Sequence, residues 1–269
     1  MSRMRPQVVA HRGDSEENAE HTLGAFLAAI EAGADGLECD VRLTADGHLV
    51  CVHDRDLRRV AAQRRGLIST MDLADLHQVD IASWKRPWAE LDDEAPVVDE
   101  SMHGVLTLRR LMEVAAEAPR RIELLIETKH PTRYGGLVER RLVQLLSEFG
   151  WDGADSPVRI MSFAHTALQR VQRLAPEVRV VQLFERAEMW PALRRMVGRD
   201  WLVGPGIGEL TDHPGLAWRL AESPHEINVW TVNTPEQLAL CRSLGVTAVI
   251  TDRPRVMRGL VDALPADDP

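Results

Sequence analysis

Eight short apolar runs, most of them rich in Val and Ile, alternate with segments of helical periodicity along nearly the whole chain of 269 residues. This alternation is typical of parallel strands that are buried on both faces and joined by crossover helices. Eight such units close into a TIM (β/α)8 barrel, an α/β fold whose chemistry lies at the C-terminal ends of the strands. The predicted strands cover residues 8–11, 36–40, 122–127, 158–162, 178–183, 202–206, 227–232 and 248–252.

The predicted helices lie between these strands, and several begin at Thr or Pro, which are favoured at the N-cap and in the first turn. The chain length is normal for one barrel, and a hydrophobic content of 45% can supply its core. We therefore predict a single barrel domain over residues 1–269. The predicted helices cover residues 22–32, 107–118, 137–149, 166–174, 235–244 and 255–264.

A hairpin is predicted directly after the second strand. The dipeptide Asp46-Gly47 lies between two β-prone runs, and Asp-Gly in this position is a strong hairpin signal. If these two residues form the whole loop, Asp40 on the second strand faces His53 on the returning strand. The hairpin therefore extends strand 2 and is expected to bring His53 to the site.

An insertion of about residues 58–103 separates this hairpin from the next strand–helix unit. Its periodicity is weak, so we predict a small inserted subdomain or a long lid, of the kind that functional loops provide. Trp84 and Trp88 in this segment are expected either to form its own small core or to contact the alcohol part of a larger substrate.

Charge and composition exclude several classes of protein. The net charge is -9, and no run of Lys and Arg is long enough to follow a nucleic-acid backbone. No stretch approaches the roughly 18 apolar residues of a membrane span. The sparse cysteines, Cys39, Cys51 and Cys241, argue against a disulfide framework, and no signal peptide precedes His11, so a cytoplasmic location is expected. The partner is expected to be a small-molecule substrate.

Three acidic residues fall at predicted C-terminal strand ends: Glu38 and Asp40 on the second strand, and Glu127 on the third. Glu38 and Asp40 share a face because side chains alternate along a strand. Three converging carboxylates repel one another unless a cation lies between them. Ligation by oxygen alone favours one hard divalent ion, Mg²⁺ or Ca²⁺.

Two cations and two histidines complete this set. Arg12 and Lys129 can hold an anion such as phosphate, and His11 and His53 can exchange protons near neutral pH. A metal ion, cations and a pair of histidines together suit the cleavage of a phosphoester.

At these residues the chain resembles the glycerophosphodiester phosphodiesterase family of the bacterial type. The resemblance extends from about residue 8 to residue 254, in the order of the family. The matching motifs are His11-Arg12-Gly13, Glu20-His21-Thr22-Leu23, residues 33–41, Leu43-Thr44, Asp46-Gly47, His53-Asp54, residues 126–129, Ser162-Phe163, residues 230–233 and residues 251–254.

The resemblance implies a metal-dependent phosphodiesterase that hydrolyses glycerophosphodiesters to glycerol 3-phosphate and an alcohol. It also implies a role for each matching residue. The metal ligands are Glu38, Asp40 and Glu127, the acid–base pair is His11 and His53, and the phosphate contacts come from Arg12 and Lys129. Near the substrate, Trp230 and Phe163 are expected either to wall the glycerol pocket or to pack in the core.

Two positions depart from the family pattern. His21 replaces the usual Asn, and Thr247 replaces the usual Asp of the last strand–helix unit. Neither change removes a predicted ligand or proton carrier. We therefore expect the protein to be active, but not necessarily with the substrate preference that is usual in the family. Two alternatives remain: a phospholipase-D-like barrel that acts on lysophospholipids, and a catalytically silent barrel that binds a phosphorylated ligand.

Overall fold

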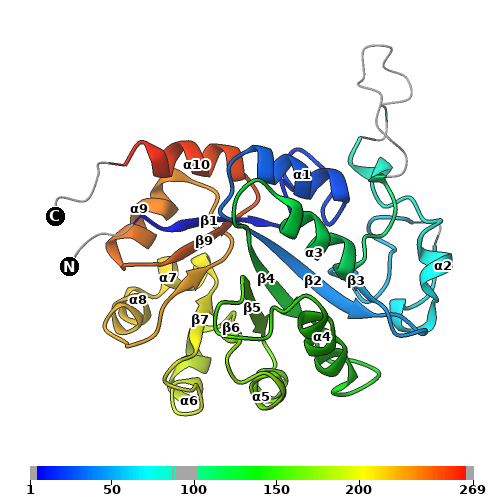
Figure 1. Cartoon of the computed structure of the whole chain (residues 1–269). Coiled ribbons are helices and arrows are strands. Elements are labelled where there is room, and N and C mark those ends of the chain that lie inside the picture. Colours follow the sequence, from blue (N-terminus) through cyan, green and yellow to red (C-terminus); the bar gives the residue numbers. More distant parts are fainter. Residues whose placement is uncertain (1–4, 63, 87, 89–101, 265–269) are drawn as a thin grey trace.

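The computed structural model describes residues 5–62, 64–86, 88 and 102–264. In this part of the chain eight parallel strands form a ring, in the spatial order β7, β6, β5, β4, β2, β1, β9, β8. Parallel bridges from Val203 to Ile227 and from Gly206 to Trp230 join the two ends of this order. The predicted TIM barrel is therefore confirmed (Figure 1). The strands are β1 (Gln7–His11), β2 (Gly36–Leu43), β4 (Glu123–Thr128), β5 (Val158–Ser162), β6 (Arg179–Phe184), β7 (Leu202–Pro205), β8 (Asn228–Val229) and β9 (Ala248–Thr251).

The helices lie outside the ring of strands, and the six predicted ones are present within two residues of their expected ends (Figure 1). Thr22, Thr107 and Thr234 are N-caps whose hydroxyl groups accept a backbone N–H bond. The predicted helices are α1 (Leu23–Glu31), α3 (Leu108–Glu117), α4 (Leu137–Glu148), α5 (His165–Leu174), α9 (Pro235–Ser243) and α10 (Pro254–Asp262). The helices that the sequence pattern did not predict are α2 (Leu73–Leu76), α6 (Trp190–Leu193), α7 (Ile207–Asp212) and α8 (Pro214–Ala221).

One hydrophobic cluster fills the barrel interior, with side chains from six of its strands. The cluster contains Val9, Leu125, Met161, Val181, Leu183, Leu202, Ala248 and Ile250, and Phe163 and Trp230 pack against it. Because side chains alternate along a strand, His11 shares the inward face of β1 with Val9, and Glu127 shares that of β4 with Leu125. The interior core therefore forms the floor on which the polar residues lie.

The hairpin after β2 is present, but its predicted register is wrong. Strand β3 (Leu49–Cys51) pairs antiparallel with β2, and Val41 is opposite Cys51. The loop has three residues and not two, since Thr44 N–H donates to His48 O at 2.9 Å and Gly47 has a φ of 87°. A turn followed by a left-handed glycine is the usual geometry of a three-residue hairpin loop.

The shifted register changes the neighbour of Asp40. Val52 N–H, and not His53, donates to Asp40 O, at 2.9 Å. His53 follows one residue later, beyond the paired part of the hairpin, and still lies at the site.

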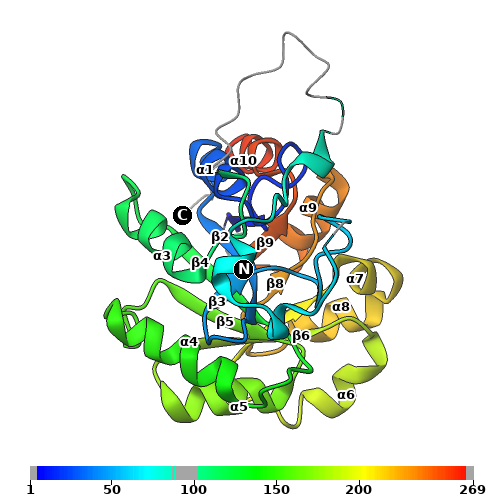
Figure 2. The same ribbon diagram turned by 90° about the vertical axis from the view of Figure 1, so that its right-hand side faces the viewer.

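The described part of the insertion packs as a cap beside β3, in cyan in Figure 2. It contains α2 and two short 3₁₀ helices, η1 (Ile68–Thr70) and η2 (Ser83–Lys85). Its core is formed by Leu57, Ile68, Leu76, Val79 and Ile81, which pack against Val50, Val52 and Val105. The insertion also contains an acidic run, Asp92-Asp93-Glu94, which lies outside the described residues.

The two tryptophans of the insertion do not belong to this core. Trp84 is 37% exposed and Trp88 is 74% exposed. The expectation that they form the core of the insertion is therefore wrong, because aliphatic side chains fill that space. None of the described helices is long and apolar enough to cross a membrane.

Candidate active site

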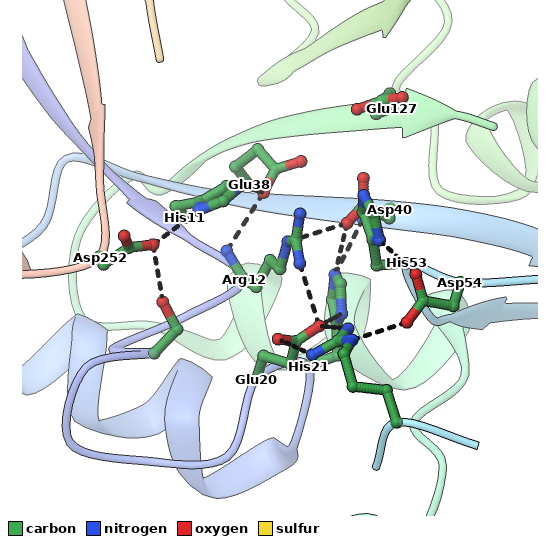
Figure 3. A network of polar contacts seen from close by, with 12 residues as sticks. His11, Arg12, Glu20, His21, Glu38, Asp40, His53, Asp54, Glu127 and Asp252 are labelled. Atoms are coloured by element: carbon green, nitrogen blue, oxygen red, sulfur yellow. Dashed lines mark hydrogen bonds and ion pairs between the residues drawn. The ribbon is translucent and has the colours of Figure 1, made fainter. Parts of the chain in front are cut away.

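The predicted polar residues meet at the C-terminal ends of β1, β2 and β4 (Figure 3). His11 is the last residue of β1, Glu38 and Asp40 lie on β2, and Glu127 lies near the end of β4. Parallel pairing aligns these strand ends, since His11 is in register with Glu38, and Asp40 with Glu127. This edge is where the active sites of TIM barrels lie.

A sharp turn after β1 brings Arg12 over β2. Arg12 and Gly13 both have positive φ, 59° and 86°. A Cβ at Gly13 would lie 2.7 Å from the carbonyl carbon of Ala25, so only glycine fits where the turn passes α1. As a result, the Arg12 N–H reaches both the backbone oxygen of Glu38 (3.0 Å) and its carboxylate (3.1 Å).

Glu38, Asp40 and Glu127 form a buried acidic triad. Each residue offers one ligand oxygen, and these atoms all lie within 4.8 Å of one another. Burial and the like charge of Asp40 raise the pKa of Glu38 well above its ordinary value. The same two causes raise the pKa of Glu127 to about 8, against the attraction of Lys129.

Two basic side chains contact the acidic triad. Lys129 Nζ lies 2.8 Å from Asp40 Oδ1 and 2.9 Å from Glu127 Oε1, and Arg12 Nε lies 3.1 Å from Asp40 Oδ2. Burial would raise the pKa of Asp40, but the charges of Lys129 and Arg12 hold it well below its ordinary range. Among the described residues no donor makes an aligned hydrogen bond to Asp40 Oδ2. Three converging buried carboxylates with a spare oxygen fit a hard divalent cation.

His11 is held by a carboxylate that comes from the far end of the sequence. Its Nδ1 lies 2.7 Å from Asp252 Oδ1. Asp252 in turn accepts hydrogen bonds from Ser15 Oγ (3.1 Å) and Asn233 Nδ2 (2.7 Å). Burial would raise the pKa of Asp252, but the hydrogen bond with His11 lowers it to about 2. The Nε2 atom of His11 lies on the side of Glu38, 3.9 Å from the Oε2 atom of that residue.

His53 has a corresponding arrangement at the mouth of the site. Its Nδ1 lies 2.8 Å from Asp54 Oδ1, and Asp54 also accepts from Arg59 Nε at 2.7 Å. His53 is 34% exposed, against 19% for His11. Burial lowers the pKa of His53, and the charge of Asp40 opposes this shift.

Behind Arg12 and Asp40 lie three further polar side chains: Glu20, His21 and Arg59. Glu20 accepts from Arg12 at 3.1 Å and from Arg59 at 2.6 Å. Burial would raise the pKa of Glu20, but the hydrogen bond from Arg59 and the charge of Arg12 lower it to about 2. His21 Nε2 accepts the Asp40 N–H at 3.0 Å, which requires a neutral ring. Burial lowers the pKa of His21 to about 3, consistent with that state.

Sequence reasoning gave several of these residues no role. Asp54 and Asp252 stood in the matched motifs, next to His53 and Thr251, and those motifs could have marked them. Arg59 lies in the insertion, where no pattern marks it. Only the fold brings it beside Glu20.

Phe163 and Trp230 meet each other above the interior core. Their rings make an edge-to-face contact, with 5.6 Å between centroids and an angle of 87°. The Trp230 indole donates to Gly204 O at 2.9 Å. This geometry shows the packing role; the role as a wall of the glycerol pocket stays a prediction.

These features define the chain as a barrel enzyme. Buried acids, two histidine–carboxylate pairs and two basic side chains all lie at the C-terminal strand ends of a TIM barrel, where the active sites of such enzymes are found. Residues 11–256 match the profile of the Glycerophosphoryl diester phosphodiesterase family, and the chain belongs to this family. It is a phosphoric diester hydrolase, which excludes the catalytically silent barrel.

Relatives and solved structures agree with this assignment. The chain is 39% identical over 256 residues to a Mycobacterium tuberculosis protein named "Probable glycerophosphodiester phosphodiesterase 1", covering 93% of this chain and 90% of that protein. It is 29% identical to the glycerophosphodiester phosphodiesterase of Caldanaerobacter subterraneus, covering 96% and 98%. A phosphodiesterase of Oleispira antarctica, solved with its product sn-glycerol-3-phosphate, superposes with a TM-score of 0.78 at 25% identity, covering 96% and 97%.

Proposed function

We propose that this enzyme hydrolyses glycerophosphodiesters to glycerol 3-phosphate and an alcohol, with one divalent ion, Mg²⁺ or Ca²⁺, held by Glu38, Asp40 and Glu127. The observation that carries the proposal is the convergence of three ligand oxygens within 4.8 Å of one another, beside His11 and His53. The product bound to the Oleispira antarctica phosphodiesterase supports the choice of substrate class.

The metal supplies, when bound, the positive charge that offsets the acidic triad and polarises a phosphoryl oxygen. Arg12 and Lys129 add fixed positive charge at the same place, since each contacts Asp40. Negative charge builds on the phosphoryl group in the transition state, and fixed cations at this place stabilise it.

Proton transfer is assigned to His11 and His53. A carboxylate at Nδ1 fixes the orientation of each ring and leaves Nε2 to give or take a proton. One histidine deprotonates the attacking oxygen, and the other protonates the oxygen of the leaving alcohol. Phe163 and Trp230 wall the side of the pocket that receives the glycerol carbons.

The wider setting of the site completes the proposal. The chain is one barrel domain with an inserted segment at about residues 58–103, and we assign the role of a lid to the described part of this segment. Lys85 Nζ donates to Ser15 O at 2.9 Å, which supports this placement beside the β1–α1 turn. A cytoplasmic location is supported by Cys39, Cys51 and Cys241, all buried and free.

A second candidate substrate class is a lysophospholipid, and the insertion provides the observation that favours it. Trp84 lines a pocket together with His11 and Arg12, and its ring is 37% exposed. Trp88 and Leu67 are also exposed apolar side chains of the insertion. Faster release of choline from lysophosphatidylcholine than from glycerophosphocholine would support this class.

The proposed function is tested by glycerol 3-phosphate release from glycerophosphocholine and glycerophosphoglycerol. We expect turnover with Mg²⁺ or Ca²⁺ and its loss after treatment with a chelator, followed by recovery when the ion is added back. Unimpaired turnover of the metal-stripped enzyme would contradict the role of the acidic triad.

A further inference from the structure

A groove beside the acidic triad has positively charged side chains and no acidic residue in its lining. We call it the cationic groove and define it by Arg42, Arg55, Lys129 and Arg133. It lies between the β4–α4 loop and the segment around η1. A local excess of positive charge is unexpected at random in a chain of net charge -9.

The cationic groove is continuous with the catalytic site through two of its residues. Arg42 lies two residues beyond Asp40 on β2, so the two side chains share a face of the strand. Lys129 both lines the groove and contacts Asp40 and Glu127. The groove and the acidic triad therefore share the Lys129 side chain.

The arginines of the groove differ from their neighbours in how they are paired. Arg58 and Arg59 form ion pairs with acidic side chains. Within the part of the chain that the structure describes, no such pair involves Arg42, Arg55 or Arg133. The guanidinium of Arg42 donates instead to the backbone oxygen of His53, at 2.6 and 3.0 Å.

The two walls of the groove are tied together. The Tyr134 hydroxyl donates to Ser69 O at 2.6 Å and links the β4–α4 loop to the insertion. The Arg133 guanidinium lies over the Tyr134 ring, 5.7 Å from its centroid. These contacts hold Arg133 and the two walls in place before a ligand arrives, which reduces the ordering required on binding.

The pocket on the other side of the site has a different character. It is lined by His11, Arg12 and Lys85 but also by Glu16 and Glu20. Charges of both signs there do not select for an anion. The cationic groove does, since guanidinium groups form strong, charge-assisted hydrogen bonds with phosphate oxygens.

We propose that the cationic groove binds the leaving alcohol of glycerophosphodiesters in which this alcohol carries a second negative charge, such as another phosphodiester or a phosphate monoester. The inference rests on the proposed hydrolysis at the acidic triad and deepens it by naming the substrate class. The glycerol end then lies toward Phe163 and Trp230, and the anionic alcohol lies along Arg42, Arg55 and Arg133.

The test compares kcat/KM for three diesters whose leaving alcohols carry different charges: bis(glycerophospho)glycerol (anionic), glycerophosphoglycerol (neutral) and glycerophosphocholine (cationic). For the intact enzyme we expect the anionic substrate to exceed the neutral one by about tenfold, and the cationic one to be the slowest. The double variant Arg55→Gln/Arg133→Gln is expected to bring the ratio of anionic to neutral substrate down to about two.

The matched control removes two positive charges elsewhere. Arg194→Gln/Arg219→Gln changes exposed arginines next to α6 and in α8, on the side of the barrel away from β3 (Figure 1), and should leave the ratio as it is. Raising the salt concentration should narrow the ratio for the intact enzyme but not for the groove variant.

The inference is overturned if the intact enzyme hydrolyses all three diesters at similar kcat/KM, or if the control lowers the ratio as much as the groove variant does. In that case the proposed function stands. If none of the three is hydrolysed in the presence of Mg²⁺ or Ca²⁺, the proposed function itself falls, and this inference falls with it.

Discussion

Lys129 Nζ lies 2.8 Å from Asp40 Oδ1, and the same ammonium group lies 2.9 Å from Glu127. One cation thus spans two members of the acidic triad. Burial would lower the pKa of Lys129, but Asp40 and Glu127 raise it, so the group stays charged. The stability of the site and its affinity for a metal ion should therefore be coupled through this side chain.

Lys129→Met is expected to destabilise the metal-free enzyme by about 3 kcal/mol, because it removes the cation that two buried acidic residues, Asp40 and Glu127, share. Added Mg²⁺ or Ca²⁺ can take over that neutralisation, so the rise in Tm on adding the ion should be larger in the variant than in the unchanged enzyme. Thermal unfolding in the presence of a chelator measures the destabilisation, and its comparison with unfolding at saturating ion measures the rise in Tm. Lys85→Met is the control, and an equal metal-induced rise in all three proteins would contradict the coupling.

The stability of the metal-free enzyme should depend on the protonation of Glu127. Its pKa is about 8 in the folded chain, above its ordinary value of 4.5, so the folded state binds the proton more tightly than the unfolded state. This contribution to stability is complete below pH 4.5 and is lost as the pH rises through 8.

Metal binding has the opposite dependence, because the ion must displace that proton. We therefore expect the metal-induced rise in Tm to grow between pH 6 and pH 8. Glu127→Gln should flatten the pH dependence of the metal-free protein in this range. If Glu127→Gln does not change how the stability of the metal-free protein depends on pH, that dependence comes from another group.

His11 and Asp252 are expected to act as a unit in catalysis. His11→Ala should lower kcat by about 10²-fold or more without unfolding the protein. Asp252→Asn should also lower kcat, because it weakens the hydrogen bond that orients the ring. The double variant should be no slower than His11→Ala, since the orienting group has nothing left to orient.

The same measurement on His53→Ala should give a comparable loss. His48→Ala, at an exposed histidine directly after the hairpin loop, is the control and should keep normal turnover. Near-normal rates in both His11→Ala and His53→Ala would remove the acid–base assignment.

The sequence was sufficient for the barrel because its strands are mostly buried on both faces and so appear as short, mainly apolar runs. It was also sufficient for the acidic triad, since a spacing of two residues on β2 fixes which side chains share a face. The register of the hairpin was not accessible in this way. A two-residue loop and a three-residue loop both suit Asp46-Gly47, and the choice depends on the φ of Gly47 and on the Thr44 to His48 pairing.

Other parts of the site depend on contacts between distant segments. Asp252 is 241 residues from His11, and Arg59 is 39 residues from Glu20. Side-chain periodicity carries no information about such pairs. The short helices α6 and α7 were missed because four to six residues are too few to show a period.

Gly13→Ala tests the turn that carries Arg12. The added methyl group would clash with the backbone of Ala25, and the new alanine would be strained by the positive φ at this position. We therefore expect a loss of about 3 kcal/mol in the free energy of unfolding and a fall in kcat. Gly259→Ala is the matched control, in α10, where nothing lies within 4 Å of the new atom. It should be slightly stabilising, because alanine favours a helix more than glycine does. Urea unfolding of both variants distinguishes them.

His21 provides the last prediction, because it is one of the two positions at which the family resemblance leads us to expect another residue. The residue has a φ of 61° and accepts the Asp40 N–H through Nε2. Asparagine tolerates this backbone region and offers an amide oxygen as acceptor. His21→Asn should therefore keep turnover within about threefold. His21→Leu cannot accept the N–H, strains the backbone and should lower both stability and kcat, by more than about tenfold for kcat. Equal activity of the Asn and Leu variants would show that the hydrogen bond to Asp40 does not position the acidic triad, and that the departure from the family at this residue has no bearing on catalysis.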